Sequence, residues 1–267
     1  MLVKRTNQDI QPVLDYIGED YVQCFYLYMD VIECGAEEEG LGLWTSEENG
    51  QISCVYYRYY DCLHLYGREG CVLEDAQKLL EEIQPNVIIC PKYILEQLEE
   101  ILNLDDYIYE SNHIITANKE MEGGLDVDIK EATDADVEEI ADLMLKADIF
   151  SEVYEREALI ESLRRRLEEG FGRLFIIRDE TGRMIATNAT NGETDKIAVV
   201  GGLVTDPEMR GRGLGRAITA STWNLVRNEG KRGLAYLIED NIKTIRLHEK
   251  MGYDFIGYSA KLVKKEK

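Results

Sequence analysis

Residues 199–216 read VVGGLVTDPEMRGRGLGR, and this stretch decides how the rest of the chain is interpreted. Its apolar start predicts a β-strand, a turn rich in glycine and arginine follows, and a helix is expected from about Leu214. Exposed backbone N–H groups in such a turn, together with the positive end of the following helix, form a site for phosphate oxygens. The stretch therefore predicts that the chain binds a phosphorylated cofactor.

Three kinds of phosphate-binding loop share features with this turn. A Walker A loop requires G-x-x-x-x-G-K-[ST], but no Lys-Ser or Lys-Thr pair follows these glycines, which disfavours a nucleoside triphosphate. The dinucleotide fingerprint G-x-G-x-x-G requires a final glycine where the run Gly211–Arg216 has arginine, and it belongs to an early βαβ unit. The third pattern, R-x-x-G-x-G, is matched by residues 210–215, which read RGRGLG.

On this third pattern, the segment resembles the GNAT superfamily of acyl-CoA-dependent N-acyltransferases. The resemblance extends over residues 127–260, where we expect a strand, two helices, a hairpin, the strand before the turn, a long helix and a closing strand–helix–strand. It implies that backbone N–H groups of the turn bind the pyrophosphate of coenzyme A. Arg210, Arg212 and Arg216 flank the turn, and cations at a helix start are unfavourable unless an anion binds there. Solvated helix-start charges are the alternative.

A second segment strengthens the resemblance. Residues 241–253 read NIKTIRLHEKMGY, which is similar to another family signature, with asparagine at a helix start and a glycine–aromatic pair at the end. Asparagine is a preferred N-cap residue, so we expect Asn241 to cap the helix that follows it. The resemblance implies that Asn241 also makes a polar contact to pantetheine or substrate. The two roles are compatible.

Gly201 and Gly202 interrupt the strand that enters the turn. Glycine in a strand often marks a bulge or the close approach of a ligand, and a purely structural bulge is one interpretation. In the resembled family this strand diverges from the next, and the pantetheine arm lies between them, bonded to the main chain like an added strand. The expected cofactor-binding residues are Leu203, Val204, Thr205, Arg210, Gly211, Arg212, Gly213, Leu214, Gly215, Arg216 and Asn241.

Acyl transfer to an amine needs a group that takes the amine proton and one that protonates the departing thiolate. A free alkylamine has a pKa of about 10.4, so a carboxylate or water chain usually removes its proton. Glu239 is the candidate base, with Glu193 and Asp195 as alternatives, and any of them can be a solvated charge. The resembled family commonly has a tyrosine acid where this chain has His248. A neutral imidazole N–H can donate, so His248 is the candidate acid; a helix-surface histidine is the alternative.

The chain carries a net charge of −22, unevenly distributed. Residues 1–125 hold 7 basic and 25 acidic side chains, whereas residues 126–267 hold 23 basic and 27 acidic. An acidic surface repels nucleic acid and anionic lipid, so we expect neither as a partner. Solubility alone can account for the charge, and a polycationic acceptor is the alternative.

The cysteines and histidines do not predict a metal site. None of the six cysteines forms a C-x-x-C pair, and none of the three histidines stands at zinc-site spacing from a cysteine. Reduced thiols suit the apolar runs in which several cysteines stand, and the first residues lack the apolar segment of a secretory signal. With no apolar run of 18 residues, we expect a cytoplasmic protein without a membrane span or a bound metal.

The composition changes near residues 121–124, which we take as the boundary between a domain of residues 1–124 and one of residues 125–267. In the first domain, residues 21–32 and 51–66 are expected to be strands. The order of elements looks like a degenerate copy of the same fold that lacks the glycine-rich turn. The resemblance therefore implies an α/β protein, with a twisted mixed sheet flanked by helices, in two tandem GNAT-like domains. The first would shape the acceptor pocket or mediate formation of a homodimer.

The expected function is transfer of an acetyl group from acetyl-CoA, as co-substrate, to a primary amine of a small molecule or peptide. Direct attack by the amine requires no protein nucleophile. A module that binds acyl-CoA without catalysis, as a sensor or interaction partner, is the alternative. His248 in place of tyrosine, and a strand before the turn without a carboxylate, support that alternative.

Overall fold

The computed structural model describes residues 1–73 and 75–265, which divide into two compact units. Unit 1 comprises Met1–Ile114, Leu237–Asp240 and the chain from Ile256 onward; unit 2 comprises Ile115–Tyr236 and Asn241–Phe255. This division differs from a single boundary at residue 124, because most of strand β12 (Asp254–Lys264) lies in unit 1.

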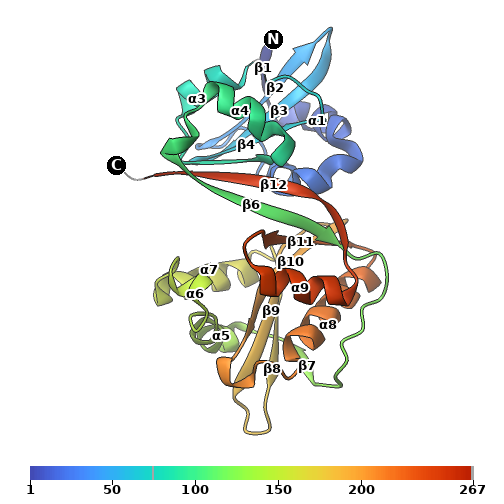
Figure 1. The fold of residues 1–267 in the computed structure, drawn as a ribbon. Helices are drawn as coiled ribbons and strands as arrows, with labels where there is room; N and C mark the ends of the chain where they lie inside the picture. The colour runs from blue at the N-terminus through green and yellow to red at the C-terminus, as the bar shows by residue number, and fades with distance from the viewer. Residues whose placement is uncertain (74, 266–267) are drawn as a thin grey trace. The chain divides into compact units, whose positions relative to one another are not determined.

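Unit 1 contains a mixed sheet with the strand order β1-β2-β3-β4-β5-β12-β6 (Figure 1). β4 and β5 are parallel, whereas β12 pairs with β5 in the antiparallel direction, with Ala260 opposite Cys90. Its other strands are β1 (Leu2–Arg5), β2 (Leu41–Glu48), β3 (Gln51–Tyr59), β4 (Cys62–Gly67), β5 (Val87–Pro91) and β6 (Tyr107–Thr116). Its helices are α1 (Ile10–Ile17), α2 (Phe25–Cys34), α3 (Ala76–Ile83) and α4 (Leu95–Ile101).

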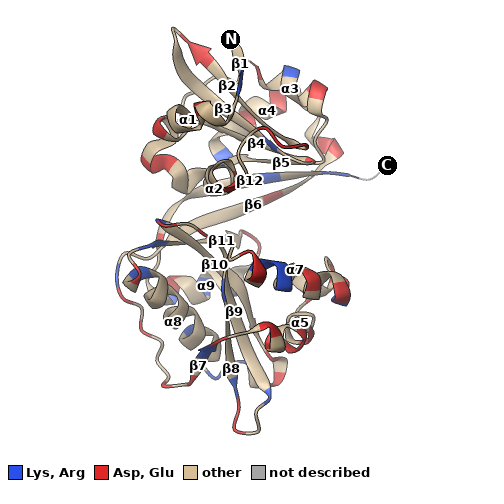
Figure 2. Ribbon diagram, turned by 180° about the vertical axis from the view of Figure 1, so that it is seen from behind, with Lys and Arg blue, Asp and Glu red and all other residues tan. Residues whose placement is uncertain are grey.

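The four helices of unit 1 are strongly acidic (Figure 2). They carry eight aspartate or glutamate side chains and a single basic one, Lys78. These helices therefore present a surface that attracts cations and repels polyanions.

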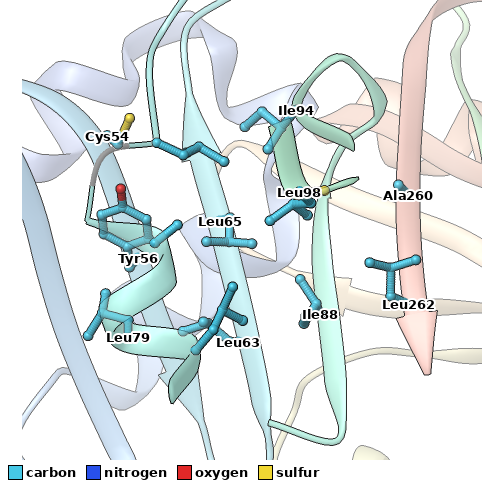
Figure 3. Packing of buried hydrophobic residues seen from close by; sticks show 14 residues of the cluster. Cys54, Tyr56, Leu63, Leu65, Leu79, Ile88, Ile94, Leu98, Ala260 and Leu262 are labelled. Atoms are coloured by element: carbon cyan, nitrogen blue, oxygen red, sulfur yellow. The ribbon is translucent and has the colours of Figure 1, made fainter. Parts of the chain in front are cut away.

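A hydrophobic core joins α3 and α4 to the sheet of unit 1 (Figure 3). Leu79 of α3 and Leu98 of α4 are fully buried in this core, together with Leu63 of β4. Leu262 of β12 is fully buried in the same cluster. Since burial of one leucine side chain stabilises a fold by about 1.5–3 kcal/mol, the packing as well as the pairing holds β12 in unit 1.

Residues 21–32, expected to be a strand, are helical. A 3₁₀ segment (Gly18–Gln23) leads into α2, and the buried positions Phe25, Tyr28 and Val31 recur every three residues. That spacing places them on one helical face. The prediction was wrong because it followed the high strand propensity of the aromatic and β-branched residues in this segment. The spacing of its buried residues is that of a helix.

The other segment expected to be extended, residues 51–66, is a hairpin of β3 and β4. The chain reverses at Tyr60 and Asp61, where Tyr60 has the left-handed φ of 53°. Tyr56 and Tyr57 of β3 are fully buried, and because neighbouring strand residues point to opposite faces, both faces of this strand are covered.

Unit 2 has the strand order β7-β8-β9-β10-β11, in which β10 and β11 are parallel and the other pairs antiparallel. Helices α5 and α7 pack with Leu174 and Ile176 of β8, whereas α8 packs with Phe175 and Ile177. Because neighbouring strand residues point to opposite faces, these helices cover both faces of the sheet. The strands are β7 (Ile129–Glu131), β8 (Leu174–Arg178), β9 (Met184–Glu193), β10 (Ile197–Thr205) and β11 (Arg232–Ile238). The helices are α5 (Val137–Met144), α6 (Asp148–Ser151), α7 (Arg156–Glu168), α8 (Leu214–Asn228) and α9 (Ile242–Met251).

Across residues 1–73 and 75–265, every helix is too short or too polar to cross a membrane.

Candidate cofactor and acyl-transfer site

The glycine-rich turn between β10 and α8 has a backbone that glycine alone adopts easily. Gly211 has a φ of 77° and Gly213 a φ of 84°, both in the left-handed region. The first hydrogen bond of α8 runs from the Ala217 N–H to the Gly213 carbonyl oxygen, at 3.0 Å. The N–H groups of Leu214, Gly215 and Arg216 precede that bond, so the helix itself gives them no acceptor. They are donors placed at the positive end of the helix dipole.

The three arginines around the turn are not equivalent. Nε of Arg210 donates to the Thr205 carbonyl at 3.2 Å, and Nε of Arg216 donates to the Glu122 carbonyl at 2.8 Å. Each bond uses Nε, and the terminal guanidinium nitrogens carry four further N–H donors. Arg212 is exposed at the tip of the turn. The arrangement suits a diphosphate, because guanidinium groups bind phosphate oxygens in bidentate fashion.

Strand β10 contains the bulge that its glycines predicted. The pairing register with β9 shifts between Gly201 and Val204, and Gly202 has a left-handed φ of 69°. A Cβ on Gly201 would lie 2.4 Å from Nδ2 of Asn191, so a larger residue would displace that side chain. Glycine is therefore favoured at both positions of the bulge, at residue 201 by the close Asn191 side chain and at residue 202 by its left-handed φ.

After the bulge, β10 remains attached to β9. Val204 pairs with Thr187 of β9 and Thr205 with Ala186, whereas the parallel register with β11 covers Ile197–Val199. The strand thus continues for several residues beyond its registered pairing with β11. Main-chain groups on that edge can bond an extended ligand such as a pantetheine arm.

Asn241 caps α9. Its side-chain oxygen accepts a hydrogen bond from the Thr244 N–H at 3.2 Å, which confirms the expected cap. The side-chain amide group adds two further donors. The contact to pantetheine or substrate stays a prediction.

His248 is buried on α9, with 6% of its surface exposed. Its Nδ1 lies 2.8 Å from the Thr244 carbonyl oxygen. A carbonyl oxygen only accepts, so we assign the proton to Nδ1, which leaves Nε2 of the neutral ring as an acceptor. Burial lowers the pKa of His248, which favours that neutral ring. As a general acid His248 would need a second proton or the other tautomer, and this role stays a prediction.

Glu239 belongs to unit 1, whereas the turn, Asn241 and His248 belong to unit 2. Its carboxylate is 3.2 Å from Nζ of Lys92. Hydrogen bonding to Ser111 and Lys92 lowers the pKa of Glu239. The group is ionised at neutral pH, but the same hydrogen bonds make it a weaker proton acceptor than a free glutamate, and its role as base stays a prediction.

Glu193, one of the alternative bases, is held in an ion network. Its carboxylate accepts hydrogen bonds from Arg173 at 2.8 and 3.0 Å, and also from Lys231 and Thr190. Only 9% of its side chain is exposed. These partners engage both carboxylate oxygens, which points to an anchor for the β9 end rather than a base. Asp195, the other alternative, is exposed beyond that end.

Comparison with known proteins agrees with this geometry. The model of the acetyltransferase (GNAT) family matches residues 138–253. Residues 138–253 are a GNAT acetyltransferase domain. The GNAT domain includes β10, the glycine-rich turn, Asn241 and His248, so the resemblance inferred from the sequence is confirmed.

Solved structures extend the likeness in fold beyond the GNAT domain. A Drosophila protein superposes with a TM-score of 0.64 at 12% identity, covering 99% of this chain and 98% of its own. A GCN5-related N-acetyltransferase from Sphaerobacter thermophilus gives 0.63 at 14% identity, covering 98% and 95%. A tandem GNAT protein from the clavulanic acid biosynthesis pathway gives 0.61 at 12% identity, covering 98% and 97%. A search of the curated proteins found no relative. The mixed α/β sheet of tandem GNAT proteins is thus the fold of this chain.

Asp206, directly before the turn of the GNAT domain, was not among the predicted site residues. It is 1% exposed and contacts Lys146 at 2.8 Å. The signal in the sequence was the Asp-Pro pair that ends the strand, since aspartate before proline often starts a turn. Its partner could not be read from the sequence, because Lys146 is 60 residues away.

The described residues hold no group of three His, Cys, Asp or Glu side chains that could bind a metal ion. All six cysteines are free thiols.

Proposed function

We propose that the protein transfers an acetyl group from acetyl-CoA to a primary amine of a small molecule or peptide by direct attack. The observation that carries the proposal is the turn between β10 and α8. It combines two left-handed glycines, helix-start N–H groups without an intrahelical acceptor and three arginines. These are the donors that a diphosphate needs.

The donor would lie along the end of β10. The diphosphate of acetyl-CoA would take the turn, and the pantetheine arm would bond the main chain after the bulge. Asn241, which caps α9, would add a side-chain contact. The proposed cofactor-binding residues are Leu203, Val204, Thr205, Arg210, Gly211, Arg212, Gly213, Leu214, Gly215, Arg216 and Asn241.

The chemistry would begin with removal of a proton from the incoming ammonium group. Glu239 is ionised at neutral pH, as a glutamate ordinarily is, and Ser111 and Lys92 lower its pKa further. It is the proposed base, acting directly or through water. The free amine then attacks the thioester carbonyl, and the nitrogen of the tetrahedral intermediate loses its extra proton to water. The C–S bond breaks to give the amide, and the departing CoA thiolate takes a proton from His248 or from solvent.

A second candidate function is an acyl-CoA-binding module without catalysis. The hydrogen bond between His248 and Thr244 favours it, because the neutral ring then offers the site an acceptor where an acid is needed. Both candidates require the same diphosphate site and differ only in turnover.

A single screen separates the two. The purified protein would be incubated with acetyl-CoA and a panel of amines, and free thiol would be measured. Thiol release that depends on one class of amine supports the transferase. Binding of acetyl-CoA by calorimetry, with no amine-dependent release across the panel, supports the module. Absence of binding would overturn both.

The charge of unit 1 supports an acceptor with several positive charges, and the panel should therefore include polyamines and lysine-rich peptides. Carboxylates outnumber basic side chains on its helices (Figure 2) and raise the local concentration of cations.

A role of unit 1 in a homodimer would be tested by sedimentation. The free thiols support a reducing compartment such as the cytoplasm.

A further inference from the structure

Asp206 is a buried carboxylate at the point where β10 ends and the turn begins. Only 1% of the residue is exposed. A buried charge is costly unless it is paired and hydrogen-bonded. Its Oδ2 lies 2.8 Å from Nζ of Lys146 and 4.0 Å from a guanidinium nitrogen of Arg183, and its Oδ1 accepts from the Glu208 N–H at 3.0 Å. Both oxygens are therefore engaged.

The main chain of Asp206 is fixed as well. Its N–H donates to the Ile185 carbonyl of β9 at 2.9 Å, and its own carbonyl accepts from the Met209 N–H at 2.8 Å. Lys146 follows the end of α5, and Arg183 directly precedes β9. Asp206 thus joins the start of the turn to two neighbouring parts of the domain.

The glycines of the turn that follows have no side chains to restrain it, and the side-chain bonds of Arg210 and Arg216 to main-chain carbonyls lie at its two ends. Gly211 and Gly213 occupy left-handed backbone, and a Cβ on Gly211 would meet no other atom within 4 Å. Glycine has the largest backbone freedom to lose on ordering. A turn that must present several N–H groups to one anion therefore needs an anchor outside its glycines.

We infer that Asp206, paired with Lys146, positions the diphosphate-binding turn and so sets the affinity for the nucleotide end of coenzyme A. The inference rests on the proposed function. Asp206 would act through the turn and not touch the cofactor, so it is a positioning residue and not a catalytic one.

Asp206 is negatively charged and lies close to the proposed site for the diphosphate, so its charge must be neutralised by nearby cations. Lys146 and Arg183 supply positive charge within 4.0 Å of Asp206. Without Lys146, the buried carboxylate would lose its nearest cation and would repel a bound diphosphate. The ion pair therefore provides rigidity and also keeps the anchor from opposing the ligand.

The test compares ligands with and without the diphosphate. Dissociation constants for coenzyme A and for pantetheine, which lacks the nucleotide and its phosphates, would be measured for the wild type and for D206A, D206N and K146M. D134A is the matched control, because Asp134 forms an exposed ion pair with Arg164 at 3.0 Å. Thermal unfolding of every variant would show whether it is folded.

We expect D206A to weaken coenzyme A binding by about tenfold or more, the usual effect of losing hydrogen bonds to a charged group. D206N keeps an acceptor for the Glu208 N–H and should lose less, while K146M should also weaken coenzyme A. Pantetheine affinity should stay within about twofold of the wild type in all variants, and D134A should change the affinity for neither ligand.

Equal loss of both ligands in D206A would mean general destabilisation, and unchanged coenzyme A affinity would mean that the turn holds itself. Either result overturns the inference and leaves the proposed function intact. A wild-type protein that binds no coenzyme A would overturn the proposed function and the inference with it.

Discussion

Nδ1 of His248 lies 2.8 Å from the carbonyl oxygen of Thr244, one helical turn earlier on α9. This one contact fixes the tautomer of the ring, with the proton on Nδ1. The GNAT family commonly has a proton-donating tyrosine at this position, whereas Nε2 of His248 offers a lone pair. The relationship makes the exchange of His248 the most informative substitution in the chain.

Replacing His248 by tyrosine should increase turnover. A phenol keeps its proton at neutral pH and can donate it to the thiolate, a contribution for which we expect a rise in kcat of about tenfold or more. The measurement is kcat with the best amine of the panel, with H248F as the control that fills the site without a donor. Equal kcat in H248Y and H248F would show that no acid acts at this position.

His248 should also make stability depend on pH. Burial lowers its pKa from the ordinary value of 6.5, so below about pH 6.5 the unfolded chain takes up a proton that the folded chain does not. The free energy of unfolding should therefore decrease as the pH falls through this range. Urea unfolding at several pH values would measure it, and H248F should show a shallower decrease; identical slopes would contradict the assignment.

Gly213→Asp should abolish coenzyme A binding. The substitution places a side chain at a φ of 84°, which costs about 1–2 kcal/mol, and directs a carboxylate toward the diphosphate. Calorimetry should show at least about a hundredfold loss of affinity. Gly182→Asp is the control, because Gly182 has a φ of 88° in the β8–β9 turn and its Cβ would meet no atom. Retained affinity in Gly213→Asp would remove the turn as the diphosphate site.

Glu239→Gln should lower kcat and leave the affinity for acetyl-CoA unchanged. The amide keeps the shape but cannot take a proton, and loss of a general base typically costs about 10²–10⁴ in rate. The pH profile is the distinguishing readout, since raising the pH supplies free amine and should restore part of the rate. Glu100→Gln, at an exposed position of α4, is the control. A rate equal to that of the wild type would assign the base elsewhere.

Glu193→Gln should reduce stability more than activity. Arg173 and Lys231 both lose Glu193 as a partner but keep Glu229. We therefore expect a loss of about 1–3 kcal/mol, the cost of lost hydrogen bonds to a charged group, below the roughly 3–5 kcal/mol of a fully unpaired buried charge. Denaturant unfolding would measure the loss, and kcat below the unfolding transition should stay within about threefold. A large loss of kcat in a fully folded variant would instead make Glu193 a candidate base.

The sequence allowed the GNAT half to be predicted well because its elements are separated by strong local signals. Helix α8 spans Leu214–Asn228, as its glycine-rich start predicted, and Asn241 begins α9 as a capping residue should. Local propensity misled only where composition and burial period disagree, as in α2. Contacts between distant residues had no local signal at all. The pairing of β12 with β5 joins positions about 170 residues apart, and the Asp206–Lys146 ion pair depends on α5 meeting the end of β10.

The pairing of β12 with β5 has a consequence for how the gene can be divided. Residues 256–264 complete a sheet that is otherwise encoded by residues 2–116, with unit 2 between them. A fragment that stops at residue 124 would leave β5 with an open edge, an invitation to aggregation. Expression of residues 1–124 alone should therefore yield a fragment with an incomplete sheet, and an insoluble product is the expected outcome.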